Sequence, residues 1–295
     1  MAEEKISFDR IMKEIIEVYP AENIIRFINT VYNEKIPLDS EVTRLATDSN
    51  YNKKLRCSDV MLKVNERVYH AEIQSDDRTM VFRMFEYGFR SAVIHGKTVT
   101  KDTLTLKFPT PVVIHLRKTP NTPKELKIRL ELPNIEPVEY MFPTKYVGDY
   151  DCDTMADGSL YAMFPFYSMK LENNLTAEEE KQCFEEIISL VERLMQDMEK
   201  GKISKTVSDL VICGIADVLS NIKSKTKIKI HNREELDKVM DNVMERKYYF
   251  KQLELFYEGV QEEKLETARK MKMDNMPLDI IRKYTDLPAA TIRAL

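Results

Sequence analysis

The hydrophobic periodicity of this 295-residue chain changes once along its length, and that change limits the folds that it can adopt. As far as Leu132, short runs rich in β-branched and apolar residues alternate with amphipathic stretches, which is typical of mixed strands and helices. From Thr176 to about Glu262 the apolar residues recur at mostly helical spacing. Helices are predicted to begin at Thr176, Ser204 and Asn232. The sequence therefore predicts an α/β part followed by an all-α part.

In the first part, residues 7–33 are predicted to form two amphipathic helices that break near Pro20. A longer helix is predicted from about Arg78 to His95, where Gly96 ends it. Its apolar side contains Val81, Phe82, Phe85, Phe89 and Val93, and its polar side contains Arg83, Tyr87 and Arg90. Short strands are predicted at Glu41–Leu45, Thr103–Lys107, Val112–Arg117 and Lys127–Leu132, after which no further strand is predicted.

Composition excludes several classes of protein. With 43% apolar and 32% charged residues the chain is typical of a globular protein, and no apolar run approaches the roughly 20 residues needed to cross a bilayer. The four cysteines form no CxxC pair, and the N-terminal residues show no apolar signal segment, so we expect a cytoplasmic protein with free thiols. A net charge of −4 argues against a protein that coats nucleic acid, although a nuclease with a local cleft is allowed. The few glycines form no phosphate-binding loop.

A predicted β-hairpin carries the most informative polar residues. The runs Asp59–Val64 and Arg67–Ser75 are separated by Asn65-Glu66, which suits a two-residue turn. If Val64 pairs with Arg67, counting outward in register pairs Asp59 with Glu72. His70, Glu72 and Gln74 share one face of their strand, because side chains two residues apart point the same way. Two carboxylates would therefore meet on one face of a sheet.

Two carboxylates at close range repel each other unless a cation joins them, and a hard divalent ion such as Mg²⁺ or Mn²⁺ is the natural partner. Such an ion polarises a phosphoryl oxygen and lowers the pKa of an attacking water. Gln74 would orient that water or the phosphate, since its amide hydrogen-bonds without charge. The alternative is that Asp59 and Glu72 are ordinary solvent-facing strand residues. His70 is either a metal ligand or, more often for a lone histidine on a strand, a structural residue.

Several short motifs follow one another along the chain. The first helices contain Asp9-Arg10-Ile11-Met12-Lys13 and Phe27-Ile28-Asn29; the hairpin contains Asp59 and Glu72-Ile73-Gln74; and the next helix contains Arg83 and Tyr87. The tail contains Ala268-Arg269-Lys270-Met271, Ile280-Ile281, Thr285-Asp286-Leu287 and Ile292, with Asp286 where a glycine is usual. In order and spacing these motifs resemble the PD-(D/E)XK nuclease superfamily, specifically its bacterial branch of transposase-like, recombination-promoting nucleases. The resemblance covers roughly residues 7–120 and 262–295.

The resemblance implies a restriction-endonuclease-like fold, a mixed sheet flanked by helices, and a metal-dependent DNA endonuclease. It implies that Asp59, Glu72 and the carbonyl of Ile73 hold Mg²⁺ or Mn²⁺, and that Gln74 replaces the more common catalytic lysine. A glutamine cannot accept a proton at neutral pH, so a water or a second metal ion must do that work. Lys13, Arg83 and Tyr87 are candidate contacts to a DNA phosphate. Their alternatives are a surface lysine and an Arg–Tyr packing pair.

The expected organisation has three parts: a nuclease-like α/β domain over residues 1–170, a helical region over 171–261 and a helical tail over 262–295. The tail resembles half of a helix-turn-helix, so it either reads DNA or joins copies of the chain as a homodimer. Met271, Met273 and Met276 are expected to form a packing surface. The lysine-rich run 223–229 is either a basic strand or a polar linker. The alternative to an endonuclease is a catalytically silent DNA- or protein-binding module of the same fold.

Overall fold

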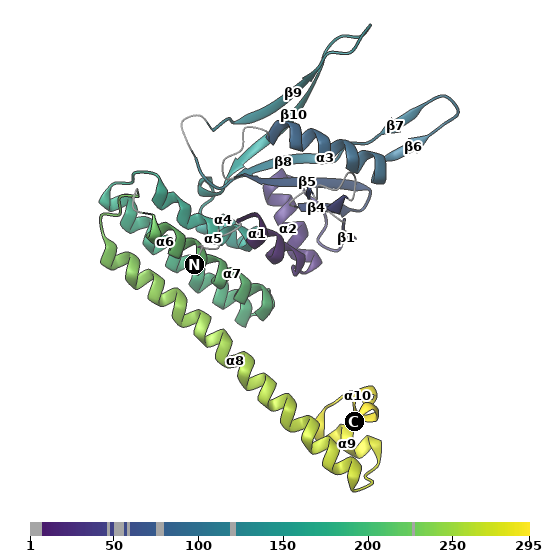
Figure 1. The fold of residues 1–295 in the computed structure, drawn as a ribbon, viewed down its shortest axis with the longest axis vertical. Helices are drawn as coiled ribbons and strands as arrows, with labels where there is room; N and C mark the ends of the chain where they lie inside the picture. Colours follow the sequence, from purple (N-terminus) through teal and green to yellow (C-terminus); the bar gives the residue numbers. More distant parts are fainter. Residues whose placement is uncertain are drawn as a thin grey trace. The chain divides into compact units, whose positions relative to one another are not determined.

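The structure is a computed structural model that describes residues 8–45, 48–49, 56–57, 60–74, 80–118, 122–225 and 228–295 (Figure 1). The chain divides into two compact units, Met1–Val243 and Met244–Leu295. The first unit contains a mixed sheet with flanking helices, and the second unit is helical. This mixed α/β architecture with a helical C-terminal part confirms the coarse prediction from the sequence. No helix in the described ranges combines the length and the apolar character that a membrane span requires.

The main sheet has six strands in the order β1-β4-β5-β8-β10-β9. Their bounds are β1 Val42–Arg44, β4 Val60–Val64, β5 Arg67–Gln74, β8 Thr110–His115, β9 Glu125–Leu130 and β10 Val138–Tyr146. The three central strands β5, β8 and β10 are parallel neighbours, and the outer pairings are antiparallel. Two further sheets have two strands each: β2 (Asp48–Ser49) with β3 (Arg56–Cys57), and β6 (Lys97–Val99) with β7 (Leu104–Leu106).

Strand β10 corrects the prediction that strands end at residue 132. It pairs with β8 on one side and β9 on the other, so it completes the parallel centre of the sheet. The sequence of β10 does not predict a strand, because Pro143 lies within it and most of its residues are exposed or only half-buried. Alternation of apolar and polar residues is consequently weak. Strand β6 was also not predicted, and β9 begins and ends two residues before the predicted strand.

The predicted hairpin register is confirmed. Val64 lies opposite Arg67, and the pairing continues outward to Val60 opposite Ala71. The next step in this register is the predicted pair of Asp59 and Glu72. Asp59 lies outside the described residues, so its own position stays a prediction.

Seven helices lie between residues 8 and 225 of the described ranges. They are α1 Phe8–Glu17, α2 Ala21–Tyr32, α3 Met80–His95, α4 Cys152–Asp157, α5 Phe164–Tyr167, α6 Ala177–Glu199 and α7 Lys205–Ser224, with the 3-10 turns η1 Val147–Asp149, η2 Tyr161–Met163 and η3 Ser168–Glu172. The hydroxyl of Thr176 caps α6 in a capping box, and that of Ser204 caps α7. Asn232 accepts a hydrogen bond from the backbone of Glu235 at the start of α8, Arg233–Met273.

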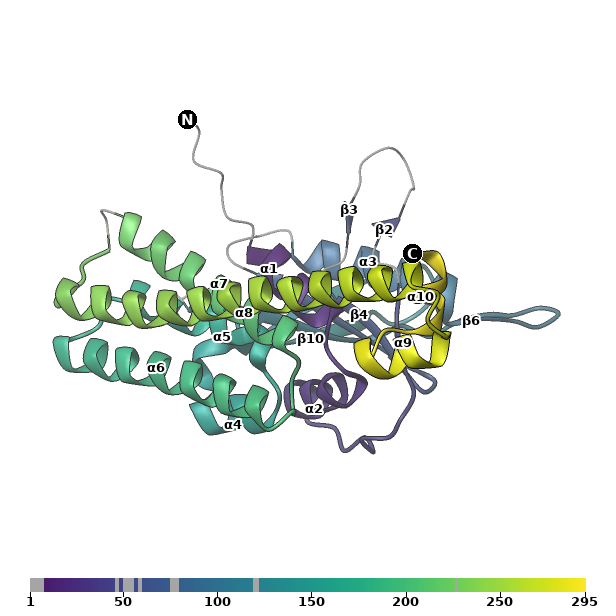
Figure 2. The same ribbon diagram turned by 90° about the horizontal axis from the view of Figure 1, so that it is seen from below.

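The two faces of the main sheet are covered by different helices (Figures 1 and 2). Helix α3 covers one face, where Met80 and Met84 pack with Val113 and Phe142. Helix α2 lies on the other face, where the rings of Tyr32 and Tyr69 meet edge to face at 5.0 Å. Because side chains alternate along β5, His70 and Glu72 point to the α3 face.

The second unit contains the end of α8, α9 (Leu278–Thr285) and α10 (Ala289–Ala294). Ala268, Ile281, Leu287 and Ile292 form its core. Helix α8 continues through Gly259 without a break. Met271 packs against the core as predicted, whereas Met273 and Met276 are exposed, which corrects the prediction for those two residues.

The lysine-rich run does not form a strand in its described residues. Helix α7 extends to Ser224, so the first part of the run is helical. The ammonium group of Lys223 pairs with Asp237 at 2.6 Å, and that of Lys225 pairs with Glu172 at 2.9 Å. These lysines therefore join the end of α7 to α8 and to η3.

Candidate functional site

The candidate site lies at the carboxyl ends of the central parallel strands, where ligands of open α/β sheets usually bind. Gln74 ends β5, and His115 ends β8 directly opposite it in the register. Tyr146, the last residue of β10, lies opposite His115 on the other side. Glu72 precedes Gln74 by two residues and therefore faces the same side of the sheet.

The carboxylate of Glu72 is fully buried and is held by two partners. Its Oε1 lies 2.9 Å from Nε2 of His70, and its Oε2 accepts a hydrogen bond of 2.9 Å from Nη2 of Arg83. A buried carboxylate that keeps its charge needs partners of this kind. Moving an unpaired ion from water into a protein interior costs on the order of several kcal/mol. The guanidinium of Arg83 supplies the opposite charge, and its side chain is only 24% exposed.

Helix α3 supplies these contacts through the side that the sequence identifies as polar. Arg83 and Tyr87 are one turn apart, and the buried residues of the helix are Met80, Met84, Tyr87, Gly88, Ser91 and Ala92. Phe82, Phe89 and Val93, assigned to the apolar side, are exposed instead. The predicted orientation of α3 is therefore wrong for these residues. The face that packs on the sheet is instead the one that carries Met80, Met84 and Ala92, and Arg83 meets the buried Glu72 beside it.

Tyr87 completes the packing around Glu72. Its ring meets the ring of His70 at a centroid distance of 6.1 Å, and the guanidinium carbon of Arg83 lies 6.0 Å from its centroid. Burial, and secondly the charge of Glu72, raise the pKa of Tyr87 above its ordinary value. The phenol is therefore a neutral hydrogen-bonding group at physiological pH.

The predicted metal ligands fit a hard cation in chemistry. Glu72 offers carboxylate oxygens and Ile73 a backbone carbonyl, and oxygen donors of this kind are what Mg²⁺ prefers. The two oxygens of Glu72 contact His70 and Arg83, and a carboxylate oxygen can in general accept more than one contact. Within the described ranges no group of three His, Cys, Asp or Glu side chains is placed to hold a metal ion. Asp59, the third predicted donor, lies outside those ranges.

The remaining predicted site residues are placed to different extents. Gln74 is fixed by its backbone at the end of β5, opposite His115. Lys13 is half-buried on α1, beside the buried Met12. The structure thus brings Glu72, Arg83 and Tyr87 together, and it adds His70, which the sequence left open between a ligand and a structural residue. The two-residue spacing from His70 to Glu72 is the signal that identifies this contact.

His115 is a site residue that the sequence did not indicate. It is 7% exposed, and its Nε2 has no hydrogen-bond partner among the described residues. Burial lowers the pKa of His115, so the imidazole is neutral near pH 7. It follows an unbroken apolar run, Val112–Ile114, which gives no hint that a polar group ends the strand.

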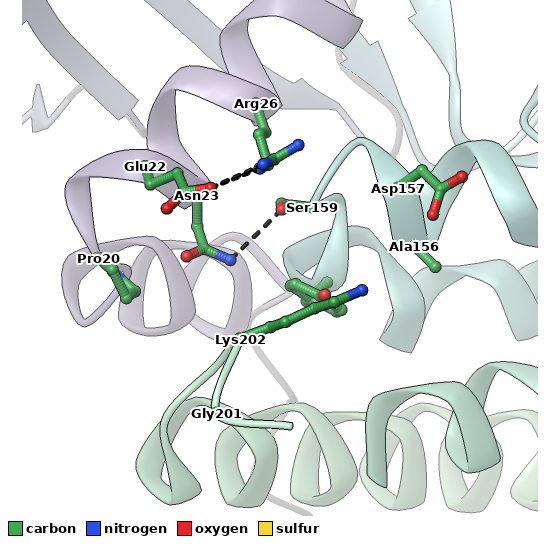
Figure 3. A pocket seen from close by; sticks show the side chains of 10 residues that line it. Pro20, Glu22, Asn23, Arg26, Ala156, Asp157, Ser159, Gly201 and Lys202 are labelled. Atoms are coloured by element: carbon green, nitrogen blue, oxygen red, sulfur yellow. Dashed lines mark hydrogen bonds and ion pairs between the residues drawn. The ribbon is translucent and has the colours of Figure 1, made fainter. Parts of the chain in front are cut away.

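A separate cavity of about 560 Å³ lies between α2, the end of α4 and the turn after α6 (Figure 3). Its buried wall contains Asn23, whose amide donates to Oγ of Ser159 at 3.3 Å. The charged residues that line it have partners: Arg26 pairs with Glu22, and Lys202 pairs with Asp197. The cavity therefore presents no net charge to a ligand.

Comparisons of the chain with protein-family models, with curated proteins and with solved structures returned no match.

Proposed function

We propose that this protein is a magnesium-dependent DNA endonuclease of the PD-(D/E)XK type, in the transposase-like, recombination-promoting class. The observation that carries the proposal is the fully buried carboxylate of Glu72 at the end of the central parallel strand. The confirmed hairpin register supports it, because one further step in that register would pair Asp59 with Glu72. With Asp59 beside Glu72, the two carboxylates would need a cation in addition to Arg83, which compensates only one charge.

Asp59, Glu72 and the carbonyl of Ile73 would hold Mg²⁺ or Mn²⁺. When bound there, the ion would polarise the scissile phosphate and lower the pKa of the attacking water. The residues of the chain have simpler tasks. His70 and Arg83 fix the rotamer of Glu72, one on each oxygen. Gln74 would hydrogen-bond the water or the phosphate, and Lys13, Arg83 and Tyr87 would contact the DNA backbone.

A catalytically silent DNA- or protein-binding module is the second candidate. It is favoured by the 2.9 Å ion pair of Arg83 with Glu72, because a guanidinium in this position supplies the positive charge that a metal ion would otherwise bring. It is also consistent with Gln74, which cannot act as a base.

Cleavage of supercoiled plasmid in Mg²⁺ or Mn²⁺ separates the two candidates. We expect D59N, E72Q and a chelator each to reduce cleavage at least about 100-fold, since each removes part of the metal site. The matched control is E66Q, which removes a carboxylate that is 95% exposed at the turn of the same hairpin. Wild-type protein that binds DNA without cleaving it would favour the silent module, and protein that does neither would overturn both DNA-directed readings.

Metal binding can be measured without activity. Titration of Mn²⁺ followed by its electron paramagnetic resonance signal should show a site in the wild type and in E66Q that is lost in E72Q. Equal binding by wild type and E72Q would contradict the role given to Glu72.

A further inference from the structure

Strands β6 and β7 form a ribbon that extends away from α3 and the main sheet (Figures 1 and 2). Thr98 lies opposite Thr105 and Val99 opposite Leu104, and the strand residues are exposed except for the half-buried Leu106. An isolated two-stranded hairpin is at best marginally stable in water. Because this ribbon buries few of its side chains, we ask what holds it in place and what it could contact.

The root of the ribbon is firmly held. Phe108, which follows β7, stacks on Phe85 at 5.8 Å and meets the ring of Tyr140 edge to face at 5.5 Å. The backbone of Lys107 donates a hydrogen bond to the carbonyl of Gly96. A Cβ at position 96 would lie 2.3 Å from the carbonyl oxygen of Lys107, so glycine is what allows this close approach. The strands of the ribbon are therefore exposed, while its root is held against α3 and β10.

The ribbon is basic in a chain that is acidic overall. Lys97, Lys101 and Lys107 are exposed, and Asp102 is the single acidic residue between positions 97 and 107. No carboxylate among the described residues forms an ion pair with these lysines, in contrast to Lys223 and Lys225. At the base of the ribbon, burial and then the charge of Lys63 lower the pKa of His95, which agrees with positive surroundings.

We propose that the β6–β7 ribbon is an arm that contacts duplex DNA, with Lys97, Lys101 and Lys107 on phosphates. Unpaired lysines complement a phosphate backbone, and a two-stranded ribbon fits a major groove about 12 Å wide. The hydroxyls of Thr98 and Thr105 lie on one face of the ribbon and can hydrogen-bond phosphates or base edges. The choice of DNA as partner rests on the proposed function. The loop at residues 100–103 is polar, and Val99 and Leu104 on either side of it are 64% and 58% exposed. The three lysines of the ribbon favour a polyanion, so we commit to DNA and make membrane binding an outcome of the test.

The test compares two triple variants with equal change in charge. K97Q/K101Q/K107Q removes the basic residues of the ribbon, and K35Q/K124Q/K200Q removes three exposed lysines elsewhere. Binding of each protein to a fluorescent duplex is measured by anisotropy in EDTA over a range of salt. Each lysine that contacts a phosphate contributes roughly 0.9 to the slope of log K against log salt, so the ribbon variant should lose up to about 2.7 and the control much less. Matching melting temperatures show that all three proteins are folded.

Each outcome decides one question. If the wild type and the ribbon variant bind with the same slope of log K against log salt, the proposal that the ribbon contacts DNA is wrong. Equal losses of slope in both triple variants would also contradict it, because that result reflects net charge alone. Wild-type protein that does not bind the duplex would overturn the proposed function together with the arm. Binding to anionic vesicles that the ribbon variant loses, with duplex binding retained, would assign the arm to a membrane instead and overturn this proposal.

Discussion

Nη2 of Arg83 on α3 lies 2.9 Å from Oε2 of Glu72 on β5, and this contact joins the helix to the sheet through charge. The same carboxylate accepts a second contact from His70 on its own strand. Helix α3 is thus held on the sheet by this ion pair together with Met80 and Met84, while Phe82 and Phe89 lie on its more exposed side.

The first prediction concerns the loss of this pair. R83M leaves the charge of Glu72 buried without its guanidinium, so the free energy of unfolding should fall by about 3 kcal/mol in urea denaturation. The control is R90M, which removes the partner of Glu86 one turn away and should cost less than about 1 kcal/mol. The double variant E72Q/R83M should recover part of the loss, because the buried charge is gone. Equal effects of R83M and R90M would show that Glu72 has no need of Arg83.

The second prediction concerns His115 and pH. Burial lowers the pKa of His115 below its ordinary 6.5. As pH falls below 6.5, the unfolded chain takes up a proton at this position before the folded protein does, so stability present above that pH is lost toward the lowered pKa. H115Q should therefore lose less unfolding free energy than wild type between about pH 7.5 and 5.5. Parallel curves for the two proteins would contradict this. H95Q should shift the curve in the same direction, because burial and Lys63 lower the pKa of His95 as well.

The local elements could be predicted because their signals are local. Pro20 separates α1 from α2, Thr176 and Ser204 cap their helices, and Asn65-Glu66 sets the hairpin register. Each of these features depends on residues a few positions apart. The predicted register is confirmed as far as the pair of Val60 and Ala71.

The features that failed are those decided by distant residues. Helix α3 has two apolar sides, one with Met80 and Met84 and one with Phe82 and Phe89, and only its contacts with the sheet decide which side is buried. Strand β10 is defined by its neighbours β8 and β9 rather than by alternation, and Pro143 within it argues against a strand. His115 was missed because burial, not sequence context, makes it unusual.

The third prediction concerns the turn between α9 and α10. Asp286 ends α9 with a left-handed backbone, φ 55°, which explains why glycine is usual at this motif position. D286G should preserve or raise the protection of the α9 and α10 amides in hydrogen exchange, whereas D286V should lower the local stability by roughly 1–2 kcal/mol. If D286V matched wild type, the turn would have to tolerate a β-branched residue, contrary to the steric argument.

The fourth prediction uses one substitution at two glycines. G96A places a methyl group 2.3 Å from the carbonyl oxygen of Lys107, so the root of the β6–β7 ribbon must separate, at a cost of about 1–3 kcal/mol. G259A, on α8, meets no heavy atom of the described residues within 4 Å and should stabilise the helix by up to about 1 kcal/mol. Urea denaturation would measure the two changes in the free energy of unfolding, which should have opposite signs. Faster hydrogen exchange at the β6 and β7 amides would show that G96A destabilises the ribbon. If the ribbon is the DNA arm, G96A should also weaken duplex binding although every lysine is retained, because the arm loses its fixed direction. G96A with normal ribbon protection would show that the close approach of Gly96 and Lys107 does not hold the ribbon.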